Sequence, residues 1–195
     1  MKKIILGLTG ASGSIYFLRL LEQLSMRDME IHVVASSLGE EVLKYETGTT
    51  LSEEIERLSK NKAKIVHEDN SNLFSAAASG SSRFDGMAIV PCSMSSLAKI
   101  TCGITDTLLT RAADVMLKER RKLVLVPREA PVSTTHLQNM AKLSGEGAVI
   151  LPAMPGFYNH PQTMDDLINF VVGKTLDALE IENEYYERWE GHYEK

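Results

Sequence analysis

The chain has few cysteines, and their spacing excludes two classes of site. Cys92 and Cys102 are the only two among 195 residues, and they form no CxxC pair. A thiolate metal centre or a framework of disulfides needs more cysteines or closer spacing. We therefore predict a reduced, cytoplasmic protein that binds no metal.

The chain also lacks an excess of basic residues and a long apolar run. Its 21 lysines and arginines are outnumbered by 26 aspartates and glutamates, for a formal net charge of −5. Nucleic-acid binders present a basic surface instead. No apolar stretch approaches the ~20 residues that span a bilayer, and residues 1–8 do not have the pattern of a secretory signal. We expect no nucleic-acid or membrane partner.

What the chain does have is a regular alternation of short apolar runs and helical periodicity. Helical spacing follows most of the apolar runs, with a long helical region before residue 121 that is broken near Gly103. This order predicts a single-domain α/β fold with a parallel sheet and helices on both faces. The predicted strands are residues 4–8, 31–35, 63–66, 87–90, 123–126 and 148–151. The main predicted helices are residues 14–26, 36–45, 134–143 and 164–179.

Three short polar loops directly follow predicted strands, at residues 9–13, 91–96 and 127–131. Ligands of open parallel sheets bind outside the carboxyl ends of the strands. Small, hydroxylated and cationic residues at three such ends indicate a pocket for a phosphorylated, planar cofactor. Residues 9–13 match neither GxGxxG nor a P-loop, so their glycines also fit a purely steric role, and the serines of the second loop also fit helix caps. Tyr158 follows the sixth strand and can reach the same rim.

Charged side chains near these loops suggest a cationic pocket. Arg128 lies between two prolines immediately after a strand, where a guanidinium can bind a phosphate or a ring carbonyl with two hydrogen bonds. Glu129 is either its ion-pair partner or a carboxylate that handles protons. Arg111 and Lys118 share one helix face. Alternatively, that face is solvated and Asp114 pairs with Lys118.

The last residues, 182–195, combine charges with aromatic side chains. Tyr185, Tyr186, Trp189 and Tyr193 are unusual in a solvated tail. Aromatic residues of this kind commonly bury against a neighbouring subunit. We therefore separate a cofactor-binding domain, residues 1–181, from a C-terminal aromatic tail, residues 182–195, that packs at a subunit interface. Packing of the tail on its own domain is the alternative.

Several segments along the chain are together characteristic of one protein family. They are TGASG (9–13), KYETG (44–48), ASGSSRFDGM (78–87), PCSMSSLA (91–98), RAADVMLKERRKLVLVPREAP (111–131), HLQNM (136–140), MPGFYNHPQT (154–163), VVGK (171–174) and ERW (187–189). In these segments the chain resembles the UbiX/Pad flavin prenyltransferases. The resemblance implies a Rossmann-like (flavodoxin-like) three-layer sandwich that assembles as a homododecamer.

The same resemblance implies an activity without a metal. A dimethylallyl group passes from dimethylallyl phosphate to N5 and C6 of reduced FMN, and the prenylated FMN then serves a UbiD-type decarboxylase. Two alternatives remain. One is an FMN-dependent decarboxylase of the cysteine-decarboxylase type, although the loop PCSMSS lacks the asparagine of the PASANT-like loop in those enzymes. The other is a non-catalytic flavin carrier, which would leave the cations and the carboxylates Glu46 and Glu129 without a role.

The resemblance also assigns roles to residues. Ser12 would lie near N5 of the flavin, Glu46 would assist proton removal, and Glu129 is the third residue expected to be catalytic. FMN would be held by Gly10, Ala11, Ser12, Ser36, Ser93, Met94, Ser95, Ser96 and Arg128. The prenyl phosphate site would comprise Arg111, Lys118, Arg128, Glu129, Tyr158, Lys174 and Trp189. The resemblance allows Arg111, Lys118 and Tyr158 to act from a neighbouring subunit. Lys174 stands where the family usually has arginine, which leaves open whether the donor is a monophosphate or a diphosphate.

Overall fold

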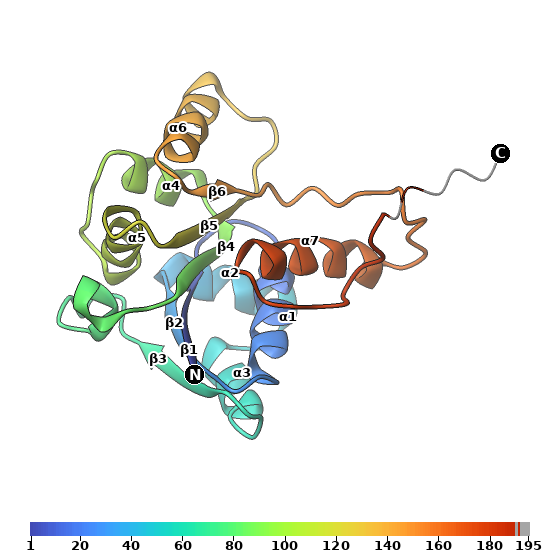
Figure 1. Cartoon of the computed structure of the whole chain (residues 1–195), viewed down its shortest axis with the longest axis horizontal. Helices are drawn as coiled ribbons and strands as arrows, with labels where there is room; N and C mark the ends of the chain where they lie inside the picture. Colours follow the sequence, from blue (N-terminus) through green and yellow to red (C-terminus); the bar gives the residue numbers. More distant parts are fainter. Residues whose placement is uncertain (190, 192–195) are drawn as a thin grey trace.

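A six-stranded parallel sheet forms the centre of the fold. The computed structural model describes residues 1–189 and 191, and its strands are ordered β3-β2-β1-β4-β5-β6 (Figure 1). The strands are β1 (Lys2–Leu8), β2 (Met29–Ala35), β3 (Lys64–Glu68), β4 (Gly86–Cys92), β5 (Lys122–Pro127) and β6 (Val149–Ile150). The prediction of a parallel sheet is confirmed.

Helices cover both faces of this sheet, as expected. They are α1 (Ser14–Ser25), α2 (Ser37–Thr47), α3 (Leu51–Leu58), α4 (Met94–Thr101), α5 (Leu108–Lys118), α6 (Thr134–Gly145) and α7 (Met164–Ala178). Two short 3-10 helices, η1 (Ala76–Ala78) and η2 (Gly80–Ser82), lie in the segment predicted to be a loop with a helical turn. Helix α3 was not predicted. Within residues 1–189 and 191, no helix has the length and apolar character needed to cross a membrane.

Alternation along the strands divides the core in two. Ile4, Leu6 and Leu8 of β1 are buried with α1, α3 and α7, whereas Ile5 is buried with α4, α5 and α6. Successive side chains of a strand point to opposite faces, so each apolar strand supplies both cores. Figure 1 shows α1 and α7 on one side of the sheet and α4, α5 and α6 on the other. These two buried layers hold the carboxyl ends of the strands in place.

The strand order reverses between β1 and β4. The chain runs outward from β1 through β2 to β3, and then crosses back to place β4 on the other side of β1. The loops after β1 and β4 therefore diverge to opposite faces and leave a crevice between them, which is the usual ligand position in doubly wound sheets. Two of the three loops singled out in the sequence follow these two strands.

A buried ionic network joins β2 to its neighbours at the other end of the sheet. The ring nitrogens of His32 lie 2.6 Å from Glu68 Oε1 and 2.9 Å from Glu30 Oε1. Lys3 and Lys64 pair with Glu30 at 3.3 and 3.2 Å. Hydrogen bonding by His32 is the largest cause that lowers the pKa of Glu30, to about 2, against the opposing effect of burial.

This shift makes the stability of the fold depend on pH. The pKa of Glu30 is about 2 in the folded chain against an ordinary value of 4.5, so its contribution is complete above the ordinary value and is lost as pH falls toward 2. We expect the urea midpoint to fall over this range in the wild type and less steeply in Glu30→Gln. Glu41→Gln, at an exposed position of α2, is the control. Equal slopes for all three proteins would contradict the prediction.

Candidate active site

A buried threonine joins the loops after β1 and β4. Thr9 is 1% exposed. Its Oγ1 donates to the carbonyl oxygen of Pro91 at 2.8 Å and accepts from the amide of Ser93 at 2.7 Å. The buried hydroxyl thus has both a partner that accepts from it and one that donates to it, as buried polar groups require. These two bonds fix the separation of the two loops that border the crevice.

The first turn of α1 is bound by a carboxylate of the same chain. The amides of Gly13 and Ser14 donate to Glu46 Oε2 at 3.0 and 2.9 Å. Gly13 has φ +110, a backbone conformation that residues other than glycine rarely adopt. The sequence indicated an anion at this helix N-terminus, and in the structure that anion is Glu46. Burial alone raises the pKa of Glu46, but hydrogen bonds from Ser12, Ser14 and Gly13 outweigh it and lower the pKa.

Arg128 reaches from β5 to the same loop. Its Nε donates to the carbonyl oxygen of Ser12 at 3.0 Å, while the neighbouring Glu129 accepts from the amide of Ala130 at 3.1 Å. Ser12, Glu46 and Arg128, from three different segments, therefore meet at the carboxyl end of β1. The structure brings together these three residues as the sequence predicted. Glu129 does not form the expected ion pair with Arg128.

A cavity lined by hydroxyl groups lies beside these residues. It has a volume of about 190 Å³. Ser36, Ser93 and Thr107 line it, and they are the N-caps of α2, α4 and α5. Of the serines in the second loop, Ser93 is a helix cap, and Ser93, Ser95 and Ser96 all line the cavity. Three helix N-termini converge on one space, an arrangement that favours an anion such as phosphate.

Other lining residues of this hydroxyl cavity were not singled out in the sequence. Asn70 holds the start of α5, because its carbonyl and side-chain oxygens accept from the amides of Leu108 and Leu109 at 2.8 and 2.9 Å. Lys99 also faces the cavity, and its Nζ is paired with Asp106 at 2.7 Å. The full lining is Gly10, Ser36, Leu38, Asn70, Ser93, Ser95, Ser96, Lys99, Thr107, Leu109 and Thr110.

A second, apolar cavity of about 380 Å³ lies on the other side of the α4 N-terminus. Arg128 and Glu129 line it together with the apolar side chains of Met94, Leu137 and Met154, among others. Met94 stands between Ser93 and Ser95, which line the hydroxyl cavity. A molecule with a phosphate at one end and a flat apolar ring at the other fits this pair of cavities in chemistry.

Aromatic side chains from three segments distant in sequence form a cluster, and none of them lines the two cavities. The ring of Tyr158 is 5.8 Å from that of Phe170 and 6.0 Å from that of Trp189. The Nζ of Lys174 lies 5.0 Å from the ring centroid of Tyr186. The structure therefore places Tyr158, Lys174 and Trp189 in one cluster of a single chain. Phe170 of this cluster had not been singled out, and Tyr186 had been noted only as an aromatic residue of the tail.

Arg111 and Lys118 lie elsewhere in the chain. Arg111 donates to the carbonyl oxygen of residue 78 at 3.2 Å and pairs with Asp114 at 2.9 Å. Lys118 pairs with Glu119 at 2.5 Å. The alternative pairing of Asp114 with Lys118 is thus wrong, because Arg111 takes Asp114 from the preceding turn. Neither residue lines the two cavities described above, so a role in the same site needs a second subunit.

Comparison with known proteins decides the family. The family described as Flavoprotein matches residues 1–176. Flavin prenyltransferase LpdB from Lactiplantibacillus plantarum is 48% identical over 98% of this chain and 100% of its own length. The chain belongs to the UbiX-type flavin prenyltransferase family.

Solved structures of this UbiX family agree with the fold. The crystal structure of AnUbiX (PadA1) in complex with FMN and dimethylallyl pyrophosphate has a TM-score of 0.91, with 40% identity over 98% of this chain and 99% of its own. A dodecameric FMN-dependent UbiX-like decarboxylase from Escherichia coli O157:H7 has a TM-score of 0.89, with 43% identity over 97% of this chain and all of its own. The FMN-dependent cysteine decarboxylase TvaF, at 15% identity and a TM-score of 0.60, shares the fold alone.

Gly10 tests the hydroxyl cavity. A Cβ at this position would lie 2.5 Å from Cγ of Leu38, and both residues line the cavity. Leu38 is exposed and can move, so Gly10→Ala is expected to fold while changing the shape of the cavity. We expect FMN affinity to fall about tenfold, a modest cost of overpacking, as measured by quenching of flavin fluorescence. Gly145→Ala, where a Cβ meets nothing within 4 Å, is the control, and unchanged affinity in Gly10→Ala would contradict the assignment.

Proposed function

We propose that this protein transfers a dimethylallyl group from dimethylallyl phosphate to N5 and C6 of reduced FMN. The observation that carries the proposal is the meeting of Ser12, Glu46 and Arg128 at the carboxyl end of β1. Arg128 also lines the apolar cavity, and Gly10, from the loop that holds Ser12, lines the hydroxyl cavity. The family of flavin prenyltransferases, to which the chain belongs, supports the same activity. Reduced FMN supplies the two nucleophilic atoms, and the protein supplies binding, orientation and charge.

The residues present suit FMN. The phosphate end belongs in the hydroxyl cavity, where Ser36 and the run 93–96 offer hydroxyl groups and helix N-termini. The ring end then lies toward Met94 and Arg128, with Gly10, Ala11 and Ser12 beside it. Gly10 carries no side chain that would separate its backbone from a flat ring, and a Cβ there would press on Leu38.

The aromatic cluster suits the prenyl donor. Cleavage of the allylic C–O bond leaves the electron pair on the phosphate, which departs as an anion, and a positive charge on the allyl carbon. Arg128 and Lys174 are placed to stabilise the phosphate, with Glu129 beside it. The faces of Tyr158 and Trp189 stabilise the allyl cation. Holding the allyl carbon against the acceptor atoms supplies the remaining advantage, through orientation.

Proton removal falls to Glu46 and Ser12. The first bond, from N5 to the allyl carbon, releases the N5 proton. Ring closure then consumes the alkene of the attached group: its inner carbon takes up a proton, its tertiary carbon bonds to C6, and C6 releases its own proton. The lowered pKa of Glu46 keeps its carboxylate ionised at neutral pH, so it is able to accept this proton, with Ser12 as the link to the flavin. The backbone amides that bind Glu46 also hold it in one position.

A homododecamer completes the proposed site. Arg111 and Lys118 lie outside both cavities of their own chain, and a dodecameric UbiX-like structure shares the fold. We therefore assign their charges to the donor phosphate of a neighbouring subunit. The prenylated FMN is handed to a UbiD-type decarboxylase, and the location is cytoplasmic. Interface packing of the aromatic tail is part of the same proposal, although Tyr193 lies outside the described residues.

Two other functions are weaker. The cysteine-decarboxylase alternative has only the fold in its favour, and the loop at 91–96 lacks the asparagine expected of it. A non-catalytic flavin carrier would not need Glu46 beside Ser12, nor Lys174 within the aromatic cluster.

The activity is tested by anaerobic incubation with reduced FMN and dimethylallyl phosphate. We expect the released flavin to gain the mass of one C5 prenyl unit, because both new bonds form on the same flavin. A parallel incubation with dimethylallyl diphosphate decides which donor Lys174 accepts. Flavin that is bound but unmodified with either donor would contradict the proposal.

Glu46→Gln tests the proton acceptor. The amide keeps a hydrogen-bond acceptor at the start of α1 but binds a proton poorly, so we expect FMN to bind and turnover to fall about a hundredfold. Glu53→Gln is a matched control, because Glu53 likewise accepts from a helix N-terminal segment, at the Thr50 amide 2.8 Å away, outside the cavities. Normal product formation by Glu46→Gln would remove Glu46 from the mechanism.

A further inference from the structure

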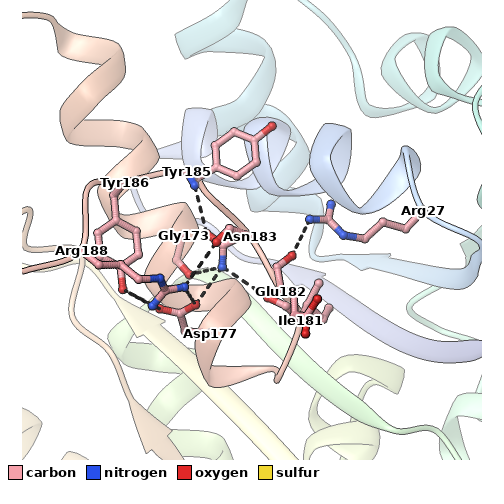
Figure 2. A network of polar contacts seen from close by, with 9 residues as sticks. All are labelled: Arg27, Gly173, Asp177, Ile181, Glu182, Asn183, Tyr185, Tyr186 and Arg188. Atoms are coloured by element: carbon pink, nitrogen blue, oxygen red, sulfur yellow. Dashed lines mark hydrogen bonds and ion pairs between the residues drawn. The ribbon is translucent and has the colours of Figure 1, made fainter. Parts of the chain in front are cut away.

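The C-terminal residues fold back along α7 and end at the aromatic cluster. We call residues 181–189 the C-terminal strap. At its start, Lys2 Nζ donates to the carbonyl oxygen of Glu180 at 2.8 Å, and Arg27 Nη2 donates to that of Glu182 at 2.9 Å. Figure 2 shows the strap lying against α7, with Arg27 reaching it from the end of α1. Its first part is therefore held through backbone carbonyls.

The second part of the strap is held by one carboxylate, Asp177 of α7. Arg188 Nη2 donates to its Oδ1 at 2.8 Å and Arg188 Nη1 to its Oδ2 at 3.1 Å. The hydroxyl of Tyr186 donates to Oδ2 at 2.6 Å, and Nδ2 of Asn183 donates to Oδ1 at 2.8 Å. Three residues of the strap thus converge on a single side chain (Figure 2). Hydrogen bonds to a charged acceptor are the stronger kind.

The protonation states of Asp177 and Tyr186 support this arrangement. Burial raises the pKa of Asp177, but the bonds from Arg188, Tyr186 and Asn183 outweigh it and lower the pKa, so the carboxylate is ionised at neutral pH. Burial and the bond to Asp177 raise the pKa of Tyr186 to about 12, so its hydroxyl remains a donor. Gly173 allows the close packing, because a Cβ there would lie 2.5 Å from Cδ1 of Tyr186.

These bonds place two aromatic rings of the candidate site. Tyr186 lies 5.2 Å from Phe170 between ring centroids and 5.0 Å from Nζ of Lys174. Trp189 directly follows Arg188 and lies 6.0 Å from Tyr158 between ring centroids. The pair of Arg188 with Asp177 is the nearest polar anchor before Trp189 along the strap. Asp177 itself lines neither the hydroxyl nor the apolar cavity.

We infer that Asp177 is a positioning residue, through which α7 holds the C-terminal strap so that Tyr186 and Trp189 form the wall of the prenyl-donor site. This inference rests on the proposed function for the identity of the donor. It predicts a defined division of effects: loss of the Asp177 charge weakens donor binding, while FMN binding and the chemical step are left largely unchanged.

The test uses Asp177→Asn in the full-length protein. Trp189 is the single tryptophan of the chain, so its emission reports directly on the strap. We expect a red shift and stronger quenching by acrylamide. The KM for dimethylallyl phosphate should rise about tenfold, as expected for lost hydrogen bonds to a charged group, with kcat and FMN affinity within about twofold of wild type.

Asp165→Asn is the matched control, because Asp165 is also on α7 and also pairs with an arginine, Arg19, at 3.0 Å, without contact to the strap. It should leave emission and KM unchanged. Arg188→Gln breaks the same pair from the exposed side and should reproduce Asp177→Asn, which keeps the test decisive if the Asp177 variant folds poorly. Asp177→Glu keeps the charge and should retain part of the donor affinity that Asp177→Asn loses.

Three results would overturn the inference. They are unchanged Trp189 emission in Asp177→Asn and Arg188→Gln, an equal shift in the Asp165 control, and a shifted emission with unchanged donor KM. Failure of the proposed function is recognised separately, because wild-type protein would then leave FMN unmodified. In that event the emission measurements still decide whether Asp177 holds Trp189, and the donor role of Asp177 is overturned with the function.

Discussion

The site depends on the two hydrogen bonds of the buried Thr9 hydroxyl. The reversal of strand order at β1 and β4 creates the crevice, but topology alone does not set the distance between the two loops that border it. Thr9 sets it, by binding a carbonyl and an amide of the β4–α4 loop at once. Loss of this hydroxyl would leave two backbone groups unsatisfied in a buried place, which costs more than the bond itself contributes.

Further polar contacts fix the loop after β1 relative to β5 and α2. Arg128 joins the end of β5 to Ser12, and Glu46 joins the end of α2 to the start of α1. Both contacts use backbone groups of residues 12–14. The segments that follow β5 and end α2 therefore both hold the short loop between β1 and α1. Glu46 satisfies the amides at the start of α1, whereas the N-termini of α2, α4 and α5 face the hydroxyl cavity. In the proposed function, the carboxylate serves proton transfer and the cavity holds the phosphate.

The sequence predicted the sheet, its helices and the rim of the crevice, because these follow from short-range patterns. Apolar alternation identifies strands, and the carboxyl ends of parallel strands meet at one edge, so residues 9–13, 91–96 and 127–131 were expected to converge. Helix α3 was not predicted because it is only eight residues long. The capping box of Thr50 and Glu53 was nevertheless a usable signal for its start. The aromatic cluster was only partly predicted. Phe170 and Tyr186 come from a helix and a chain end, and no local pattern states that these pack together with Tyr158.

The two halves of the site are built on different physical foundations. The FMN half is fixed by the buried Thr9 hydroxyl, together with more exposed bonds of Glu46 and Arg128 to the backbone of residues 12–14. The bonds of the neutral Thr9 hydroxyl are short-ranged and little affected by ions. The donor half rests on the Asp177–Arg188 pair, in which the arginine side chain is 54% exposed, and exposed ion pairs are weakened by salt. Conformational freedom concentrates where buried contacts are few. The hold of α7 on the strap is therefore expected to weaken as salt is added, whereas the hold of Thr9 on the two loops is not.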